Sequence, residues 1–191
     1  MAFRIENEIL NGIKVFVPDV LEDKRGFFME TYRKDKFNEI GIDEEFVQEN
    51  HSFSRKGVIR GLHFQFNPPV SKLIRAVNGE AYLVAVDIRK NSDTLGKWHG
   101  DFISGENKRQ IWVPEGFASG FCALRDYTEI LYKYNALYNP EGESNIIWDD
   151  AEIGIKWPSY MAEPILSDKD KKAQTLSEWL KREESNYFRL R

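Results

Sequence analysis

The stretch Val58-Ile59-Arg60-Gly61-Leu62-His63-Phe64-Gln65 precedes the sequence Asn67-Pro68-Pro69 and a second stretch, Ser71-Lys72-Leu73-Ile74-Arg75. In both stretches apolar and polar residues alternate with a period of two, which predicts β-strands. The Asn-Pro-Pro sequence breaks regular structure and indicates a turn. This part of the chain is therefore expected to form two strands separated by a turn.

Three side chains of these strands are candidates for one pocket. Arg60 and His63 have opposite parity, so a regular strand would direct them to opposite faces of a sheet. Gly61, which lies between them, is a type of residue found at bulges, where one extra residue resets the alternation. We therefore expect Arg60, His63 and Lys72 to converge, and two cations beside an imidazole suit an anionic ligand and a developing oxyanion.

The whole chain has the size and composition of one globular domain. It contains 191 residues, of which 41% are hydrophobic, and it carries 13 Phe, 8 Tyr and 5 Trp. Abundant aromatic residues favour half-buried strands and surfaces on which a ligand can stack. We expect a single domain over residues 1–191, with a core over about 1–170 and a helical tail over about 171–191.

Composition argues against several classes of protein. No apolar run approaches the length of a membrane span, and the N-terminus lacks the apolar segment of a signal peptide. The formal net charge of -4 argues against non-specific nucleic-acid binding. Cys122 is the only cysteine, so no disulfide framework is expected. We expect a cytoplasmic protein that binds neither a membrane nor nucleic acid.

Short strands recur at regular spacing along the chain. We expect them at residues 3–9, 13–18, 27–32, 46–54, 58–65, 71–75, 80–88, 97–104, 109–113, 121–125 and 127–134. A Gly-rich corner is expected at 114–121, a short helix at 34–40 and a helical pattern at roughly 171–184. This arrangement predicts an all-β fold, an antiparallel sandwich or barrel with a small C-terminal helical appendage.

Four neutral polar side chains share one face of the strand expected at 46–54: Gln48, Asn50, Ser52 and Ser54. Such a row is commonly a solvated face, but it also supplies the uncharged donors and acceptors that a sugar-binding groove needs. The sequence leaves both interpretations open.

The types of residue in the chain favour acid–base catalysis without a metal ion. The chain has three histidines, and the ammonium of Lys72 would repel a metal ion near His63, so no metal or cofactor is expected. Phosphate-cradling and dinucleotide-binding loops are absent, and Cys122 lies in a stretch typical of a buried strand. What remains is His63 as a base, Lys72 as a partner of an oxyanion and a tyrosine such as Tyr132 as an acid. A carboxylate that orients His63 could come from Asp170 or Asp87.

The chain resembles the dTDP-4-dehydrorhamnose 3,5-epimerase family, metal-free jelly-roll proteins of the cupin type that act on nucleotide-linked 4-keto-6-deoxy sugars. The matching motifs extend from about residue 23 to 170 and leave the tail uncovered. They are Asp23-Lys24-Arg25-Gly26-Phe27-Phe28-Met29-Glu30, Gln48-Glu49-Asn50, Arg60-Gly61-Leu62-His63-Phe64-Gln65, Lys72-Leu73, Val86-Asp87-Ile88-Arg89, Pro114-Glu115-Gly116-Phe117-Ala118, Tyr132-Lys133, Tyr138-Asn139-Pro140, Trp148-Asp149-Asp150, Ile155-Lys156-Trp157-Pro158 and Leu166-Ser167-Asp168-Lys169-Asp170.

The resemblance implies a role for each matching residue. His63, oriented by Asp170, would remove the proton beside the C4 ketone, Lys72 would stabilise the enolate, and Tyr132 would return a proton from the opposite face. The remaining residues would hold a nucleotide-diphospho-sugar, and they fall into three sets. Arg60, Gln48 and Asn50 would bind the sugar and diphosphate, Tyr138 would flank the base or ribose, and Arg25, Phe28 and Glu30 would enter the partner's site in a homodimer.

One position departs from the family pattern. The family reads Gly-Phe-Ala-His-Gly-Phe where this chain has Gly116-Phe117-Ala118-Ser119-Gly120-Phe121. Ser119 replaces an imidazole of the pocket with a shorter, neutral group. We therefore expect unequal proton exchange at the two carbons that flank the ketone.

Other functions compatible with the residues are an epimerase limited to C3 or C5, a sugar-nucleotide 3,4-ketoisomerase and a non-catalytic jelly-roll carbohydrate-binding module. A binding module has no use for His63, Lys72 and Tyr132 together, so the sequence favours an enzyme.

Overall fold

The computed structural model describes residues 1–158 and 163–190. The strands are β1 (Phe3–Ile9), β2 (Ile13–Pro18), β3 (Val20–Asp23), β4 (Gly26–Met29), β5 (Gln48–Ser54), β6 (Ile59–Gln65), β7 (Lys72–Asn78), β8 (Glu80–Asp87), β9 (Trp98–Ser104), β10 (Gln110–Val113), β11 (Phe117–Ala123), β12 (Thr128–Tyr134) and β13 (Glu143–Asn145). The helices are α1 (Lys34–Glu39), η1 (Pro140–Gly142), α2 (Asp168–Lys171), α3 (Leu176–Lys181) and η2 (Glu183–Phe188).

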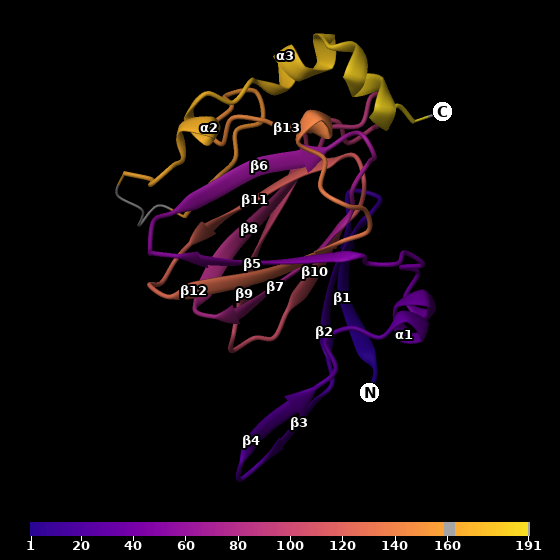
Figure 1. The fold of residues 1–191 in the computed structure, drawn as a ribbon, viewed down its shortest axis with the longest axis vertical. Coiled ribbons are helices and arrows are strands. Elements are labelled where there is room, and N and C mark those ends of the chain that lie inside the picture. The colour runs from indigo at the N-terminus through magenta and orange to yellow at the C-terminus, as the bar shows by residue number, and fades with distance from the viewer. Residues whose placement is uncertain (159–162, 191) are drawn as a thin grey trace.

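Two antiparallel sheets form the body of the protein (Figure 1). The six-stranded sheet has the order β1-β2-β10-β7-β12-β5, and the five-stranded sheet has the order β13-β6-β11-β8-β9. A core of residues from both sheets lies between them, including Ile13, Ile74 and Ile111 from the first and Leu83 and Phe121 from the second. The predicted all-β antiparallel barrel, a jelly roll, is confirmed. Among the described residues, no helix is long and apolar enough to cross a membrane.

The C-terminal tail closes a second core on the outer face of the five-stranded sheet. Trp179 is fully buried there and packs edge-on against Phe64 of β6. The predicted helical pattern is divided among α2, α3 and η2, because a backbone hydrogen bond joins Gln174 to Ile147 and Thr175 begins α3 with a capping box. The tail is thus packed onto the barrel (Figure 1).

One predicted strand and one predicted corner differ from the structure. The strand expected at 27–32 ends with β4 at Met29, because Tyr32 turns into an aromatic cluster against Phe37 and Phe46. The predicted Gly-rich corner at 114–121 is largely strand, since β11 begins at Phe117. Small residues let β11 approach β6 closely: a Cβ on Gly120 would lie 2.6 Å from the backbone oxygen of Arg60.

Candidate active site

A cavity of about 400 Å³ opens between the two sheets. Arg60 and His63 of β6 and Ser119 of β11 line it from the five-stranded sheet. Lys72 of β7 and Tyr132 of β12 line it from the six-stranded sheet. The structure therefore brings together the cationic side chains and the imidazole that the sequence placed in one pocket.

A bulge in β6 makes this convergence possible. In the register of β6 with β11, His63 lies opposite Ser119 and Arg60 lies opposite Phe121, and the register shifts between them. Gly61 and Leu62 thus face only Gly120, and the extra residue turns Arg60 and His63 to the same side of the sheet. The close approach requires glycine, because a Cβ on Gly61 would lie 2.5 Å from the Cα of Gly120. The bulge predicted at Gly61 is confirmed.

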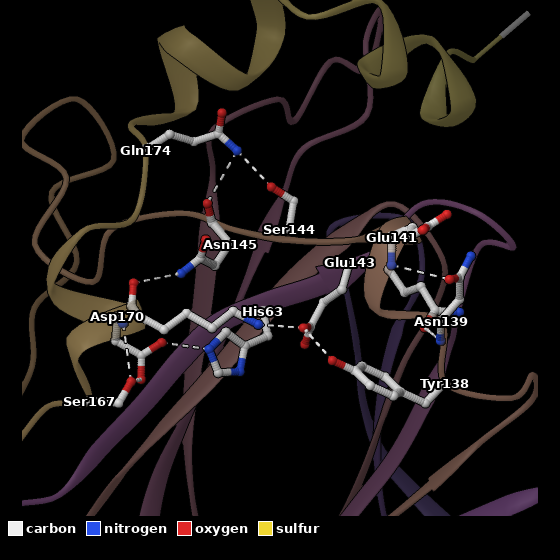
Figure 2. A network of polar contacts seen from close by, with 12 residues as sticks. His63, Tyr138, Asn139, Glu141, Glu143, Ser144, Asn145, Ser167, Asp170 and Gln174 are labelled. Atoms are coloured by element: carbon white, nitrogen blue, oxygen red, sulfur yellow. Dashed lines mark hydrogen bonds and ion pairs between the residues drawn. The ribbon is translucent and has the colours of Figure 1, made fainter.

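His63 and Asp170 form a hydrogen-bonded pair in the cavity. The Nε2 atom of His63 lies 2.6 Å from Oδ1 of Asp170, whose other oxygen accepts a hydrogen bond of 2.9 Å from Ser167 (Figure 2). Burial opposes ionisation of Asp170, but hydrogen bonds from His63, Ser167 and the Gly61 backbone outweigh it and hold the pKa of this carboxyl below its ordinary value. Asp170, which only the resemblance suggested as the orienting residue, is thus the ionised carboxylate paired with His63.

The other candidate carboxylate, Asp87, has a structural role. It is fully buried and accepts hydrogen bonds from Arg89, Ser92 and Thr94 at 2.6 to 3.0 Å. These contacts tie the loop after β8 to the end of the barrel. Asp87 is therefore not the partner of His63.

Short polar contacts hold the helix that carries Asp170 against β13. Asn145 donates a hydrogen bond of 3.2 Å to the backbone oxygen of Lys169, and Gln174 donates to the hydroxyl of Ser144 at 2.7 Å (Figure 2). β13 in turn pairs with β6, where Asn145 lies opposite His63. His63 and Asp170 are thus attached to one continuous framework.

Lys72 is a buried cation, and among the described residues no carboxylate contacts its ammonium directly. Its ammonium donates to the backbone oxygen of His63 at 2.8 Å and to the hydroxyl of Ser119 at 3.1 Å. Burial lowers the pKa of Lys72 to about 8. A lysine held in this way remains largely protonated near neutral pH and is ready to bind a developing negative charge.

Tyr132 lies on the wall of the cavity that faces His63, and Tyr134 lies beside it. The two rings are stacked, with centroids 6.0 Å apart, and the Lys72 ammonium is 5.7 Å from the Tyr134 ring. Burial raises the pKa of Tyr134, so its phenol keeps its proton. The sequence analysis did not select Tyr134 as a site residue, although its parity with Tyr132 on one strand was the signal that could have identified it.

The polar face predicted on β5 points inward. Gln48 and Asn50 are half-buried, whereas Glu49 and His51 between and beside them are exposed. Gln48 donates to Asn50 at 3.1 Å and accepts from the Tyr138 backbone at 2.8 Å. These residues lie near the cavity rather than on its lining, on the strand next to β12.

Tyr138 does not line the cavity, but it is connected to the helix of Asp170. Its hydroxyl donates to Glu143 at 3.0 Å, and Glu143 also binds the ammonium of Lys169 (Figure 2). Arg60, on the cavity wall, donates to the hydroxyl of Ser54 at 3.1 Å and to the backbone oxygen of Phe53 at 3.0 Å. Glu143 and Lys169 are further residues that sequence reasoning did not select.

The three residues expected to enter a partner's site do not reach the cavity of their own chain. Arg25 and Phe28 lie on the hairpin of β3 and β4, which projects away from the barrel (Figure 1). The Arg25 side chain is 84% exposed, and Phe28 is 63% exposed. Glu30 follows the hairpin and pairs with Arg33 at 3.2 Å.

The three histidines do not gather in one place. His51 pairs with Glu129 on an exposed part of the six-stranded sheet, and His99 lies on β9 near Asp101. In residues 1–158 and 163–190, no group of three or more His, Cys, Asp or Glu side chains is arranged to hold a metal ion. The donors and acceptors of the cavity instead suit the transfer of protons.

An antiparallel barrel that places proton donors and acceptors on facing walls of its interior defines an acid–base enzyme of the cupin architecture. The comparisons with known proteins name its family. The family model described as dTDP-4-dehydrorhamnose 3,5-epimerase matches residues 7–178. The chain belongs to this family, and it is an isomerase that acts on a nucleotide sugar.

Individual relatives agree with this assignment. The dTDP-4-dehydrorhamnose 3,5-epimerase of Methanothermobacter thermautotrophicus is 49% identical over 177 residues, which cover 92% of this chain and 96% of that protein. That of Shigella flexneri is 52% identical over 170 residues, covering 84% and 93%. Among solved structures, the dTDP-6-deoxy-D-glucose-3,5-epimerase of Legionella pneumophila in complex with dTDP-4-keto-L-rhamnose has a TM-score of 0.88 and 42% identity, covering 92% of this chain and 93% of that one.

Proposed function

We propose that this chain epimerises a dTDP-linked 4-keto-6-deoxy sugar at the carbons that flank the C4 ketone. The observation that carries the proposal is the cavity in which His63, paired with Asp170, faces Tyr132 while the Lys72 ammonium points into the same space. Protons next to a ketone are weakly acidic, so their removal needs a base and a preorganised cation at the ketone oxygen.

His63 acts as the base. Because the ionised carboxylate of Asp170 accepts a hydrogen bond at Nε2 of His63, the ring carries its proton there and leaves Nδ1 free to accept one. The C–H bond beside the ketone breaks, its proton moves to His63, and its electron pair forms the enolate. Asp170 stabilises the imidazolium that results.

Lys72 and Tyr132 complete the reaction. The enolate oxygen takes its negative charge next to the ammonium of Lys72, which lies in a buried site where such an interaction is strong. Tyr132 then donates its phenolic proton to the carbon from the opposite wall, and this inverts the configuration. The proton on His63 and the phenolate of Tyr132 return to their starting states by exchange with solvent.

The nucleotide and diphosphate are proposed to lie along the rim. Arg60 offers a guanidinium for the diphosphate, Gln48 and Asn50 offer amides for the sugar, and Tyr138 offers a ring for the base or ribose. Ser119 lines the space around the sugar. This arrangement is supported by the positions of Arg60 and Ser119 on the cavity wall and of the other side chains beside it.

We also propose a homodimer whose subunits share their sites. β5 is an edge strand of the six-stranded sheet, and an exposed edge can accept a strand from another chain. The projecting hairpin of β3 and β4 carries Arg25 and Phe28, whose side chains are exposed and do not line the cavity of their own chain. Docked on a partner, the hairpin and the neighbouring Glu30 would complete the substrate site.

The buried free thiol of Cys122 suits a reducing compartment, so a cytoplasmic location is proposed.

Incubation with dTDP-4-keto-6-deoxyglucose in D2O tests the function. Deuterium at C3 and C5, located by NMR, is the expected result. Deuterium at one carbon alone would indicate a single-carbon epimerase, a possibility that Ser119 raises. Conversion to a 3-keto sugar would indicate a ketoisomerase, and binding without exchange or conversion would indicate a carbohydrate-binding module.

A further inference from the structure

Ser119 is the one side chain among the described residues that accepts a hydrogen bond from the Lys72 ammonium. Lys72 has two hydrogen-bond partners among the described residues, the backbone oxygen of His63 at 2.8 Å and the hydroxyl of Ser119 at 3.1 Å. An ammonium has three protons, so the third remains for a ligand. Both Lys72 and Ser119 line the cavity, so a ligand can reach them at the same place.

The direction of this hydrogen bond determines what Ser119 can do. A protonated lysine has no lone pair, so Lys72 donates and the Ser119 oxygen accepts. Within the described part of the chain the Ser119 hydroxyl makes no other hydrogen bond, and therefore its own proton is uncommitted. Ser119 is 5% exposed, so this proton has a ligand in the cavity as its natural acceptor.

We propose that Ser119 is a catalytic residue, whose hydroxyl donates a hydrogen bond to the C4 oxygen of the sugar alongside the Lys72 ammonium. The inference rests on the proposed function, because the oxygen is that of the keto sugar. The ketone oxygen gains negative charge as the C–H bond breaks and loses it when the carbon is reprotonated. Ser119 keeps its proton throughout, so no proton is gained or lost at this position.

This role has a consequence for the two carbons. Removal of a proton from C3 or from C5 places negative charge on the same C4 oxygen, so a donor at that oxygen assists both steps. The shorter side chain at position 119 led us to expect unequal exchange at the two carbons. The contact between Ser119 and Lys72 adds that loss of the hydroxyl slows both exchanges by similar factors, whatever the ratio of the two rates in the unaltered chain.

Ser119 also acts on the charge of Lys72. The titratable groups around this ammonium are His63 on β6, Tyr132 and Tyr134 on β12, Glu143 on β13 and Lys169 in α2. Glu143 favours the protonated lysine, and Lys169 opposes it. A hydrogen-bond acceptor next to an ammonium favours its charged form, so removal of the Ser119 hydroxyl should lower the pKa of Lys72 further.

The test compares four proteins with dTDP-4-keto-6-deoxyglucose in D2O: the unaltered chain and the variants Ser119→Ala, Ser119→Cys and Ser185→Ala. Cysteine fills nearly the space of serine but is a weak donor. Ser185 is a matched control, because it is fully buried in the tail and donates to the backbone oxygen of Arg182, far from the cavity in the fold. Exchange at C3 and C5 is followed separately, and kcat/KM is measured against pH.

Loss of one donor to a developing oxyanion costs about 10²–10³-fold. We expect a loss of about 10²-fold at both carbons in Ser119→Ala and in Ser119→Cys, with dTDP affinity retained. The alkaline limb of kcat/KM should move to lower pH in Ser119→Ala, which a purely space-filling role would not cause. Ser185→Ala should keep the rates and the pH profile of the unaltered chain.

The outcomes separate this inference from the proposed function. An unaltered chain that exchanges neither proton would overturn the proposed function, and with it this inference. An active chain whose Ser119→Ala variant keeps its rates and its alkaline limb would overturn the inference alone. A loss at one carbon only would also overturn it, because the hydroxyl would then not act at the oxygen common to both steps.

Discussion

The imidazole of His63 and the carboxylate of Asp170 lie 2.6 Å apart, although the two residues are 107 positions apart in the sequence. His63 belongs to β6, which lies between β13 and β11 in the five-stranded sheet, whereas Asp170 lies in the short helix α2 that follows the barrel. Ser167 is the N-cap residue of this helix, and its hydroxyl also donates a hydrogen bond to the Asp170 carboxylate. The same residue therefore begins the helix and holds the side chain of Asp170 in position. The tail therefore supplies one partner of the His63–Asp170 pair.

Replacement of the base tests its role directly. A missing general base costs about 10²–10⁴-fold in rate, so we expect His63→Asn to stop deuterium exchange while nucleotide-sugar binding stays nearly intact. His51→Asn is a matched control, because His51 is exposed and pairs with Glu129 away from the cavity. Exchange like that of the unaltered protein in His63→Asn would remove this residue from the mechanism.

Heterodimers of two inactive variants should recover activity if the two subunits share their sites. Arg25→Ala and His63→Asn each remove a residue from a different part of the proposed composite site, so each homodimer should be inactive or nearly so. A heterodimer of the two variants contains one site with both residues intact, and partial activity should return on mixing. Sedimentation analysis checks the oligomeric state. A fully active monomer, or no recovery in verified heterodimers, would contradict the arrangement.

Epimerisation should continue after removal of metal ions. The ammonium of Lys72 lies beside His63, and His51 and His99 lie elsewhere on the sheets, so neither of them can share a metal ion with the His63 imidazole. We expect the rate to be unchanged after dialysis against a chelator. Loss of activity that one added divalent ion restores would refute this prediction.

Activity should decline as pH rises through about 8. Burial lowers the pKa of Lys72 to about 8, and the neutral amine formed above this pH cannot stabilise an enolate as an ammonium does. The alkaline limb of kcat/KM, which reports the free enzyme, should therefore fall near pH 8. In Lys72→Met the remaining activity should be low and should lack this limb, and a limb that persists unchanged there would assign it to another group.

The burial of the Lys72 ammonium should also lower the free energy of unfolding at neutral pH. Between about pH 8 and pH 10.5 the unfolded chain binds the more protons, so the contribution of Lys72 to the free energy of unfolding rises with pH over this window. At neutral pH, Lys72→Met should raise the free energy of unfolding by roughly 1–3 kcal/mol. Denaturant titration measures it, with Lys133→Met as control, since Lys133 is partly exposed and pairs with Glu49. A destabilised Lys72→Met variant would contradict the argument.

Local patterns in the sequence determined most of the strands, although not β3 or β13, and the convergence of Arg60 and His63 in the pocket. Alternation with a period of two depends only on neighbouring residues, and it placed most strands within a few residues of their bounds. Gly61 between Arg60 and His63 indicated the bulge, because a close backbone approach tolerates no side chain at that position. Family motifs then assigned roles to these side chains, and the pocket brings His63, Lys72, Tyr132 and Asp170 together.

Only the tertiary structure decided which distant groups meet. Nothing local in the sequence distinguishes Asp170 from Asp87 as the partner of His63. Packing of the tail on the five-stranded sheet brings Asp170 to the cavity. Asp87 is instead held in an ion pair with Arg89. The contact of Ser119 with Lys72 likewise depends on two sheets closing face to face. Contacts between strands far apart in sequence follow from chain topology and core packing, which periodicity does not encode.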